Sequence, residues 1–185
     1  MKLITGMSLL ELMIAMAILA ILLGVSMPGY KQLLDQREGD LTLRKLADSI
    51  MLARSIAAKT GQFVSLCPSQ YDLLCEGDWN DGYLVFNDAD RNRKIENEDQ
   101  ILLRVDHTGL RGSIQWRAFQ KAKTLQISPL GFIAGQSGNF TYCPEDRNPA
   151  NAAQLVINQT GRVRLAVDKD RDGFREDSQG KPLSC

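Results

Sequence analysis

The sequence has little of the chemistry on which most enzymes rely. Its 185 residues include a single histidine, His107, and contain no nucleophile elbow, phosphate-binding loop or Cys-x-x-Cys pair. Acyl transfer by a serine–histidine pair, nucleotide hydrolysis and zinc catalysis are therefore poorly supported. These absences predict a protein that is not an enzyme and has no resident cofactor.

Net charge is also lacking. The 22 basic residues balance the 22 acidic residues, so the formal net charge at pH 7 is zero. A protein without a global field does not attract nucleic acid over a distance. Any binding to nucleic acid must therefore come from a local group of cations.

One long apolar run lies near the N-terminus, and it contains only one charge. A short leader, residues 1–6, ends in Gly6. Residues 7–27 are almost entirely apolar apart from Glu11, and Pro28 closes the run. The run is close to the ~20 residues that cross a bilayer as a helix. A carboxylate in such a segment costs about 2.5–3.5 kcal/mol at the bilayer centre and less near its surface, which indicates that Glu11 has a specific role.

This arrangement resembles the class III signal of type IV pilins and pseudopilins. In these families a prepilin peptidase cuts after the glycine and methylates the new N-terminal amine, which implies cleavage between Gly6 and Met7. Met7 stands where phenylalanine is usual. Glu11 matches the family's glutamate, which pairs with the methylated amine of the same or a neighbouring subunit, and Pro28 matches the family's helix-kinking proline. The implied location is the bacterial inner membrane, with the head in the periplasm, and later the extracellular pilus.

Two other interpretations compete for this end of the chain. An ordinary secretory signal peptide has a basic region, an apolar core and small residues before its cleavage site. A plain signal anchor needs only sufficient apolar length. Both leave Glu11 unexplained, so the sequence favours the pilin-type signal.

Beyond the apolar run, helical spacing resumes and predicts one long helix over residues 7–59. Apolar residues recur every three or four positions from Leu43 to Ala57, and the opposite face carries charges that include Arg54. Short β-like runs separated by turns follow, which predicts an α+β protein with antiparallel sheet. The predicted parts are a leader (1–6), a membrane and filament-core segment (7–28), an amphipathic continuation of the helix (29–60) and a β-rich head with a C-terminal tail (61–185).

Four cysteines allow three disulfide connectivities. We favour Cys67–Cys75, which closes a short loop, and Cys143–Cys185, which holds down a polar tail. Disulfides persist outside the cytoplasm, where the apolar N-terminus directs the head. A zinc site is the alternative, but the sequence has no Cys-x-x-Cys and only one histidine.

Three motifs follow one another along the head: Trp79-x-x-Gly82-Tyr83-x-Val85-Phe86, Pro129-x-Gly131, and Asn158-Gln159-Thr160-Gly161-Arg162-Val163-Arg164. Their order and spacing resemble the GspH/FimT family of minor pilins, over most of residues 7–167. The resemblance implies a pilin fold, in which a long N-terminal helix packs on an antiparallel β-sheet domain.

The last of these motifs is the main candidate for a binding site. Gly161 is free to adopt the positive φ of a hairpin turn, and Arg162 and Arg164, two residues apart on a strand, point to one face. The motif is similar to the one with which FimT-type minor pilins bind DNA during natural transformation. This resemblance implies binding to backbone phosphates without sequence preference and with strong salt dependence. The other interpretation is a solvated face of an edge strand.

Other cations could join this pair, although the sequence does not say whether they converge. A basic stretch from Arg104 to Lys123 includes Arg117. The predicted DNA-binding residues are Gly161, Arg162, Arg164, Lys121, Lys123 and Arg147.

Two acidic loops are weak candidates for calcium. Asp168, Asp170 and Asp172 alternate before Gly173 as in a calcium loop, but the twelfth position is Gln179 instead of glutamate. The loop from Asp88 to Asn92 lacks the required glycine. Interleaved cations weaken both loops, so we predict no metal and interpret them as polar turns, with calcium at the Asp168 loop as the alternative.

The sequence thus predicts a minor pilin of a type IV pilus. Its expected partners are other pilins through the N-terminal helix, the prepilin peptidase, the inner membrane before assembly, and double-stranded DNA. The alternative is a GspH-like minor pseudopilin of type II secretion, or a pilus-priming subunit with a purely structural role.

Overall fold

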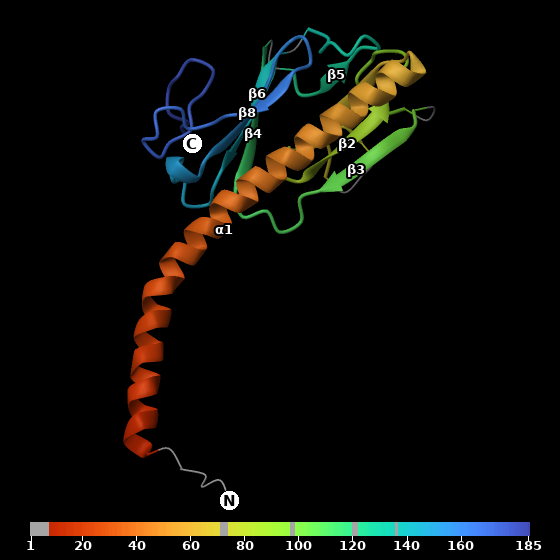
Figure 1. Ribbon diagram of the computed structural model, residues 1–185. Coiled ribbons are helices and arrows are strands. Elements are labelled where there is room, and N and C mark those ends of the chain that lie inside the picture. Colours follow the sequence, from red (N-terminus) through yellow and green to blue (C-terminus); the bar gives the residue numbers. More distant parts are fainter. Residues whose placement is uncertain (1–7, 71–73, 97–98, 120–121, 136) are drawn as a thin grey trace, which may run out of the picture. The chain divides into compact units, whose positions relative to one another are not determined.

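The computed structural model describes residues 8–70, 74–96, 99–119, 122–135 and 137–185, without the side chains of residues 25–29, 31–33 and 35. The chain forms two compact units, Met1–Asp35 and Gln36–Cys185. One helix, α1 (Leu9–Thr60), contributes to both units (Figure 1). We call the second unit the head.

The first unit is the N-terminal part of α1. Its helix is capped by Ser8, whose hydroxyl accepts a hydrogen bond from the Glu11 backbone N–H at 3.3 Å. Glu11 is exposed and lies in the first turn, where a negative charge is favourable to the helix dipole. Large apolar side chains between Leu9 and Leu23 are at least 52% exposed.

Within the part of the chain that is described, no helix combines the length and the apolar character needed to cross a membrane. The segment expected to do so, residues 7–28, includes Met7 and side chains that lie outside the description. Pro28 falls within α1, and its side chain is not described.

In the head, α1 buries the predicted apolar stripe. These residues are at most 1% exposed, because each successive member returns to the same face of the helix; they are Leu43, Leu46, Ile50, Ala53 and Ala57. The helix ends at Thr60, one residue beyond its expected end, and Gly61 follows with a φ of 70°.

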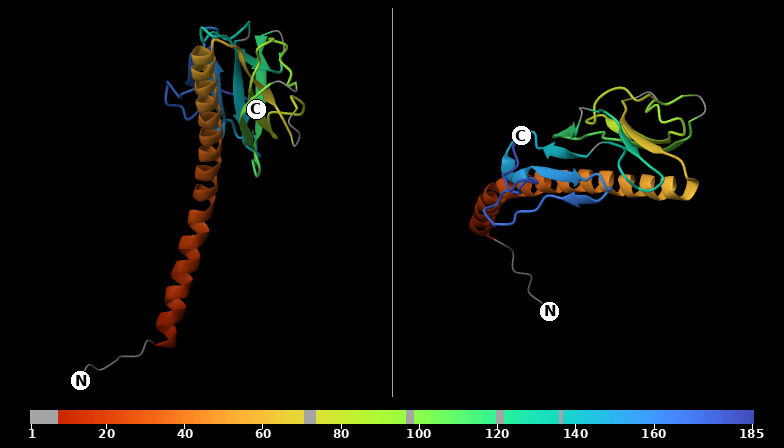
Figure 2. Two further views of the ribbon diagram at one scale, coloured as in Figure 1. Left: turned by 90° about the vertical axis from the view of Figure 1, so that its right-hand side faces the viewer. Right: turned by 90° about the horizontal axis from the view of Figure 1, so that it is seen from above.

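Two antiparallel four-stranded sheets make up the rest of the head (Figures 1 and 2). Sheet A has the order β3-β2-β1-β5 and sheet B the order β4-β6-β7-β8. The strands are β1 (Val64–Pro68), β2 (Gly82–Asn87), β3 (Ile101–Asp106), β4 (Ser113–Ala118), β5 (Leu125–Ile127), β6 (Gly138–Cys143), β7 (Ala153–Ile157) and β8 (Val163–Leu165). The predicted α+β fold is confirmed, and every expected β-run forms a strand.

The head has one main core, formed by the inner faces of both sheets and the buried stripe of α1. Aromatic rings fill the space beside β4. Trp116 stacks on Phe140 with ring centroids 4.2 Å apart, and Trp79 meets the edge of Phe140 at 4.7 Å. The two tryptophans therefore pack against the core aromatic Phe140.

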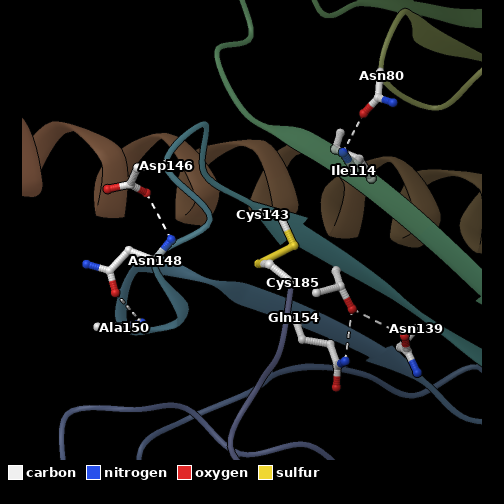
Figure 3. The surroundings of a disulfide bond; sticks show 10 residues. Asn80, Ile114, Asn139, Cys143, Asp146, Asn148, Ala150, Gln154 and Cys185 are labelled. Carbon is white, nitrogen blue, oxygen red and sulfur yellow. Dashed lines mark hydrogen bonds between the residues drawn. A yellow bond between two sulfur atoms is a disulfide. The ribbon is translucent and has the colours of Figure 1, made fainter.

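Both expected disulfides are formed, Cys67–Cys75 and Cys143–Cys185. The second joins the C-terminal tail to the end of β6 (Figure 3). The tail is also held by Arg175, whose guanidinium donates two hydrogen bonds to the Asp40 carboxylate on α1, at 2.7 and 3.2 Å. A largely polar tail is thus attached by one covalent bond and one bidentate ion pair.

Candidate nucleic-acid interface

The hairpin between β7 and β8 presents the Gly-Arg-x-Arg motif, and Asn158 organises its turn. The Asn158 side-chain oxygen accepts hydrogen bonds from the Arg162 backbone N–H and the Thr160 hydroxyl, both at 2.8 Å. The Asn158 backbone N–H donates to the Arg162 carbonyl at 3.1 Å, and its carbonyl accepts from Gly161 at 2.9 Å. An asparagine at a turn satisfies backbone groups in this way without help from other segments.

Gly161 is required by both its conformation and its surroundings. Its φ is 76°, and a Cβ at this position would lie 2.3 Å from the carbonyl oxygen of Gly131. The Gly161 carbonyl accepts a hydrogen bond from Arg54 Nη1 at 2.8 Å. Arg54, which we expected on the solvent-facing side of the helix, is half-buried and holds the hairpin turn against α1 instead.

The two arginines of the motif lie on the outer face of sheet B. Val163 and Leu165 pack against the main core, so Arg162 and Arg164, which alternate with them, point the other way. Arg162 is exposed and Arg164 is half-buried. Neither guanidinium has a hydrogen bond or an ion pair with any residue in the described part of the chain.

The strand register brings one more arginine onto this face. Arg164 pairs with Val156, Val156 with Asn139, and Asn139 with Arg117, so the four residues form one row across β8, β7, β6 and β4. Three strand spacings separate the end members by about 14–15 Å. Arg117 is exposed, and the sequence analysis counted it only within a basic stretch. Its place in the row depends on the strand order, which no local pattern gives.

Of the other predicted cations, Arg147 lies apart from this row. Arg147 lies in the loop after β6, at the end of sheet B opposite the Gly161 turn, and the six residues of β6, which span about 17 Å, separate the two ends of the sheet. Its loop is fixed by Asn148, whose side chain caps the short helix Pro149–Asn151 (Figure 3). Arg147 therefore does not converge on the arginine pair. Lys123 is exposed beyond β4, and Lys121 lies outside the described residues.

The C-terminal tail contains the better calcium candidate. Carboxylate oxygens of Asp168, Asp170 and Glu176 lie within 4.8 Å of one another. Asp172, expected in this set, instead accepts a hydrogen bond from the Phe174 backbone N–H at 2.8 Å. Asp168 accepts from the backbone N–H of Arg171, and Glu176 from that of Lys169. These bonds account for the acidic residues as turn-forming groups; the absence of a metal stays a prediction, with calcium at this loop as the alternative.

The other acidic loop carries a buried carboxylate. Asp88 is fully buried, and its Oδ2 accepts hydrogen bonds from Ser65 Oγ at 2.5 Å and Gln126 Nε2 at 2.6 Å. Asp90 is exposed and accepts from Asn92. Asp88 therefore joins β1 and β5 to the end of β2. The polar composition of its loop, typical of an exposed turn, did not predict this structural role.

His107 is largely buried, and burial lowers its pKa from 6.5. The positive charge of Lys45 lowers the pKa further, while Asp106, Asp81 and the hydrogen bond to the Trp79 carbonyl oppose the shift. His107 Nδ1 lies 2.9 Å from this carbonyl and must donate to it, and Nε2 is buried without a partner among the described residues. Protonation would create an N–H at Nε2 that has no acceptor among the described residues.

This geometry predicts that the head loses stability in mild acid. The pKa of His107 is lower in the folded chain than in the unfolded chain, so the unfolded chain binds the proton more readily. The free energy of unfolding should therefore fall as the pH drops below about 6.5. Urea unfolding between about pH 7.5 and pH 5.5 measures this, and His107→Gln should flatten the dependence. If the free energy of unfolding of His107→Gln depends on pH as steeply as that of the wild type, other groups cause the effect.

Solved structures of a minor pilin and of a minor pseudopilin share this architecture. The minor pilin FimU of the Pseudomonas aeruginosa type IV pilus shares 19% sequence identity with the chain, with a TM-score of 0.51 over 80% of this chain and 96% of FimU. The minor pseudopilin EpsH of the Vibrio cholerae type 2 secretion system shares 11%, with a TM-score of 0.51 over 69% of this chain and 95% of EpsH. The fold is thus that of minor pilins and pseudopilins.

Family comparisons give the closer assignment. Residues 42–161 match the family described as type II transport protein GspH, which is more than half of the chain, and residues 1–27 match the prokaryotic N-terminal methylation motif. The chain therefore belongs to the GspH family, and the resemblance to GspH/FimT minor pilins is confirmed. No curated protein matches it significantly. Cleavage between Gly6 and Met7, which lie outside the described residues, stays a prediction.

Proposed function

We propose that this protein is a minor pilin of a type IV pilus, whose head binds double-stranded DNA without sequence preference during natural transformation. A prepilin peptidase would remove residues 1–6 and methylate Met7. The mature subunit would wait in the inner membrane with its head in the periplasm. Assembly would then carry it into the extracellular pilus, with the N-terminal helix packed among other pilins and no catalytic role for the head.

One observation carries the DNA-binding part of the proposal. Arg162 and Arg164 share one face of an edge strand, and their guanidinium groups have no protein partner among the described residues. Arg117 lies in the same row of sheet B. Unpaired arginines on a rigid surface are free to form bidentate bonds with phosphate oxygens. Because the chain has no net charge, these few contacts would supply most of the affinity.

We expect the double substitution Arg162→Ala and Arg164→Ala to weaken DNA binding at least tenfold. Each phosphate contact that is lost reduces the number of counterions released when the protein binds, and this release favours binding. Fluorescence anisotropy of the full chain in detergent with a labelled 30-base-pair duplex measures this. The wild-type affinity should fall with salt with a logarithmic slope of about −2 to −3. Arg147→Ala is the matched control and should leave affinity and slope unchanged. Equal affinity of the double variant and the wild type would refute the site.

Filament assembly depends in this proposal on Glu11. Its carboxylate would pair with the methylated amine of Met7 in the same or a neighbouring subunit, where the low dielectric makes an ion pair strong and an unpaired charge costly. Glu11→Ala should therefore reduce the amount of this subunit in sheared pili by about tenfold or more. Immunoblotting of sheared and whole-cell fractions separates an assembly defect from lower expression. Full recovery of the variant in sheared pili would contradict this role.

The alternative function is structural. The family match to GspH and the fold shared with EpsH support a minor pseudopilin of type II secretion, or a priming subunit, whose head binds no DNA. A deletion strain distinguishes these functions, because loss of transformation with normal secretion supports the DNA-binding pilin, and the reverse supports the pseudopilin.

A further inference from the structure

A second surface of the head lies along the free edge of β4. This strand is the last of sheet B, and its pairing with β6 uses only one of its two edges. Arg117 is paired with Asn139, and the Phe119 N–H donates to the Ser137 carbonyl at 2.9 Å. Odd-numbered residues of this strand therefore direct their backbone groups toward β6.

The even-numbered residues direct their backbone groups away from β6. The Ile114 N–H confirms this direction, because it donates to the Asn80 side chain outside the sheet (Figure 3). By alternation, the N–H and C=O groups of Trp116 and the N–H of Ala118 point to the same free side. None of them bonds to a backbone group in the part of the chain that the structure describes.

A groove of about 600 Å³ runs beside this edge. Its walls are β4 on one side and the loop containing Gly77 to Asn80 on the other, with Pro68 at the end of β1. Trp79 and Trp116 line it, and the buried Trp79 indole N–H has no acceptor among the described residues. The groove thus combines apolar surface with unpaired donors and acceptors.

Charge at the groove favours an acidic occupant. Arg117 and Lys123 line it, are exposed, and have no ion-pair partner among the described residues. Asp78 also lines it, but its Oδ1 already accepts hydrogen bonds from the backbone and side-chain nitrogens of Asn80. Two cations and one carboxylate thus line the groove, and its net charge is positive.

We infer that this groove binds an extended acidic segment of another protein, which adds to sheet B as a strand beside β4. Such a strand supplies the acceptors that the Trp116 and Ala118 N–H groups lack and the donor that the Trp116 carbonyl lacks, alternately along its backbone. Its residue opposite Arg117 occupies a non-hydrogen-bonded pair, in which side chains lie closest, so glutamate or aspartate is favoured there. Alternate side chains on its other face enter the groove toward Trp79 and Trp116.

A single-stranded nucleic acid fits this groove less well. Its bases could stack on tryptophan and its phosphates could meet Arg117. However, a polyanion supplies no regular series of donors for the outward carbonyls of β4. The peptide is therefore the occupant that the backbone pattern favours.

The test uses the full chain in detergent and a capped ten-residue peptide that alternates valine with glutamate. Binding should slow hydrogen exchange at the Trp116 and Ala118 amides by roughly tenfold or more and leave the Arg117 amide, already bonded to β6, unchanged. The same peptide with N-methyl groups on alternate amides keeps every side chain but cannot pair with the edge. It should not bind, and equal binding of the methylated peptide would overturn the inference.

A charge exchange tests the register. Arg117→Glu should weaken binding of the valine–glutamate peptide about tenfold and restore binding to a valine–lysine peptide. Arg147→Glu, an equal change at the far end of sheet B, should alter neither. If the valine–lysine peptide does not bind Arg117→Glu, the proposed occupant is rejected. It is also rejected if a single-stranded thymidine oligonucleotide protects the Trp116 and Ala118 amides and the peptide does not.

Discussion

Replacing Gly161 with alanine is expected to lower the free energy of unfolding of the head by about 3–4 kcal/mol. Two costs add at this position. Alanine at a φ of 76° costs about 1 kcal/mol, and the added methyl would meet the Gly131 carbonyl oxygen at 2.3 Å and Arg54 Nε at 2.9 Å. The first contact involves backbone, which cannot rotate away, so the hairpin turn has to move.

A matched control separates the two costs. Gly180 has a φ of 79°, but no atom lies within 4 Å of a Cβ built on it. Gly180→Ala should therefore cost only the conformational term, about 1 kcal/mol. Urea unfolding followed by tryptophan fluorescence gives both values. Equal losses in the two variants would show that close packing at Gly161 contributes nothing.

Gly161→Ala should also weaken DNA binding under the proposed function, because the turn that the methyl displaces carries Arg162. The Arg54 hydrogen bond to the Gly161 carbonyl would be lost with it. Binding measured well below the unfolding midpoint distinguishes displacement of the arginines from global unfolding.

Replacing Asp88 with alanine is expected to destabilise the head by about 3 kcal/mol. The carboxylate is fully buried, and its removal leaves the Ser65 hydroxyl and the Gln126 amide without their acceptor. Each buried group left unpaired costs about 1–3 kcal/mol. Denaturant unfolding of the full chain measures the loss through its midpoint, provided that the slope with denaturant is unchanged.

The control is the neighbouring aspartate in the same loop. Asp90 is exposed and, among the residues that the structure describes, bonds only to Asn92, so Asp90→Ala should change the free energy of unfolding by less than about 0.5 kcal/mol. A loss of similar size in both variants would mean that the loop as a whole, and not the buried carboxylate, fixes the ends of β1, β2 and β5.

The features that could be predicted are those encoded by local spacing. The apolar stripe from Leu43 to Ala57, the glycine after α1 and the β-runs each depend on neighbours within a few residues, so their period and turn chemistry were sufficient. The strand after the Gly161 turn is short. β8 ends at Leu165, although Ala166 still donates a hydrogen bond to the Gln154 carbonyl.

The features that could not be predicted are non-local. Arg54 has the spacing of a surface residue, but a hairpin more than a hundred positions away covers it. Asp88 lies in a loop with the composition of a solvated turn, but β1 and β5 enclose it. The row that contains Arg117 and the exclusion of Arg147 both depend on the order of strands in sheet B, which nearby residues do not encode.

The side chain of Asn158 makes the hairpin rigid before any ligand arrives. Because this residue and Arg54 already fix the backbone of the turn, capture of a polyanion would immobilise only two guanidinium side chains, at an entropic cost of about 0.5–1.5 kcal/mol each. No loop would have to fold on contact. Under the proposed function, the hairpin could therefore bind DNA without first changing its backbone conformation.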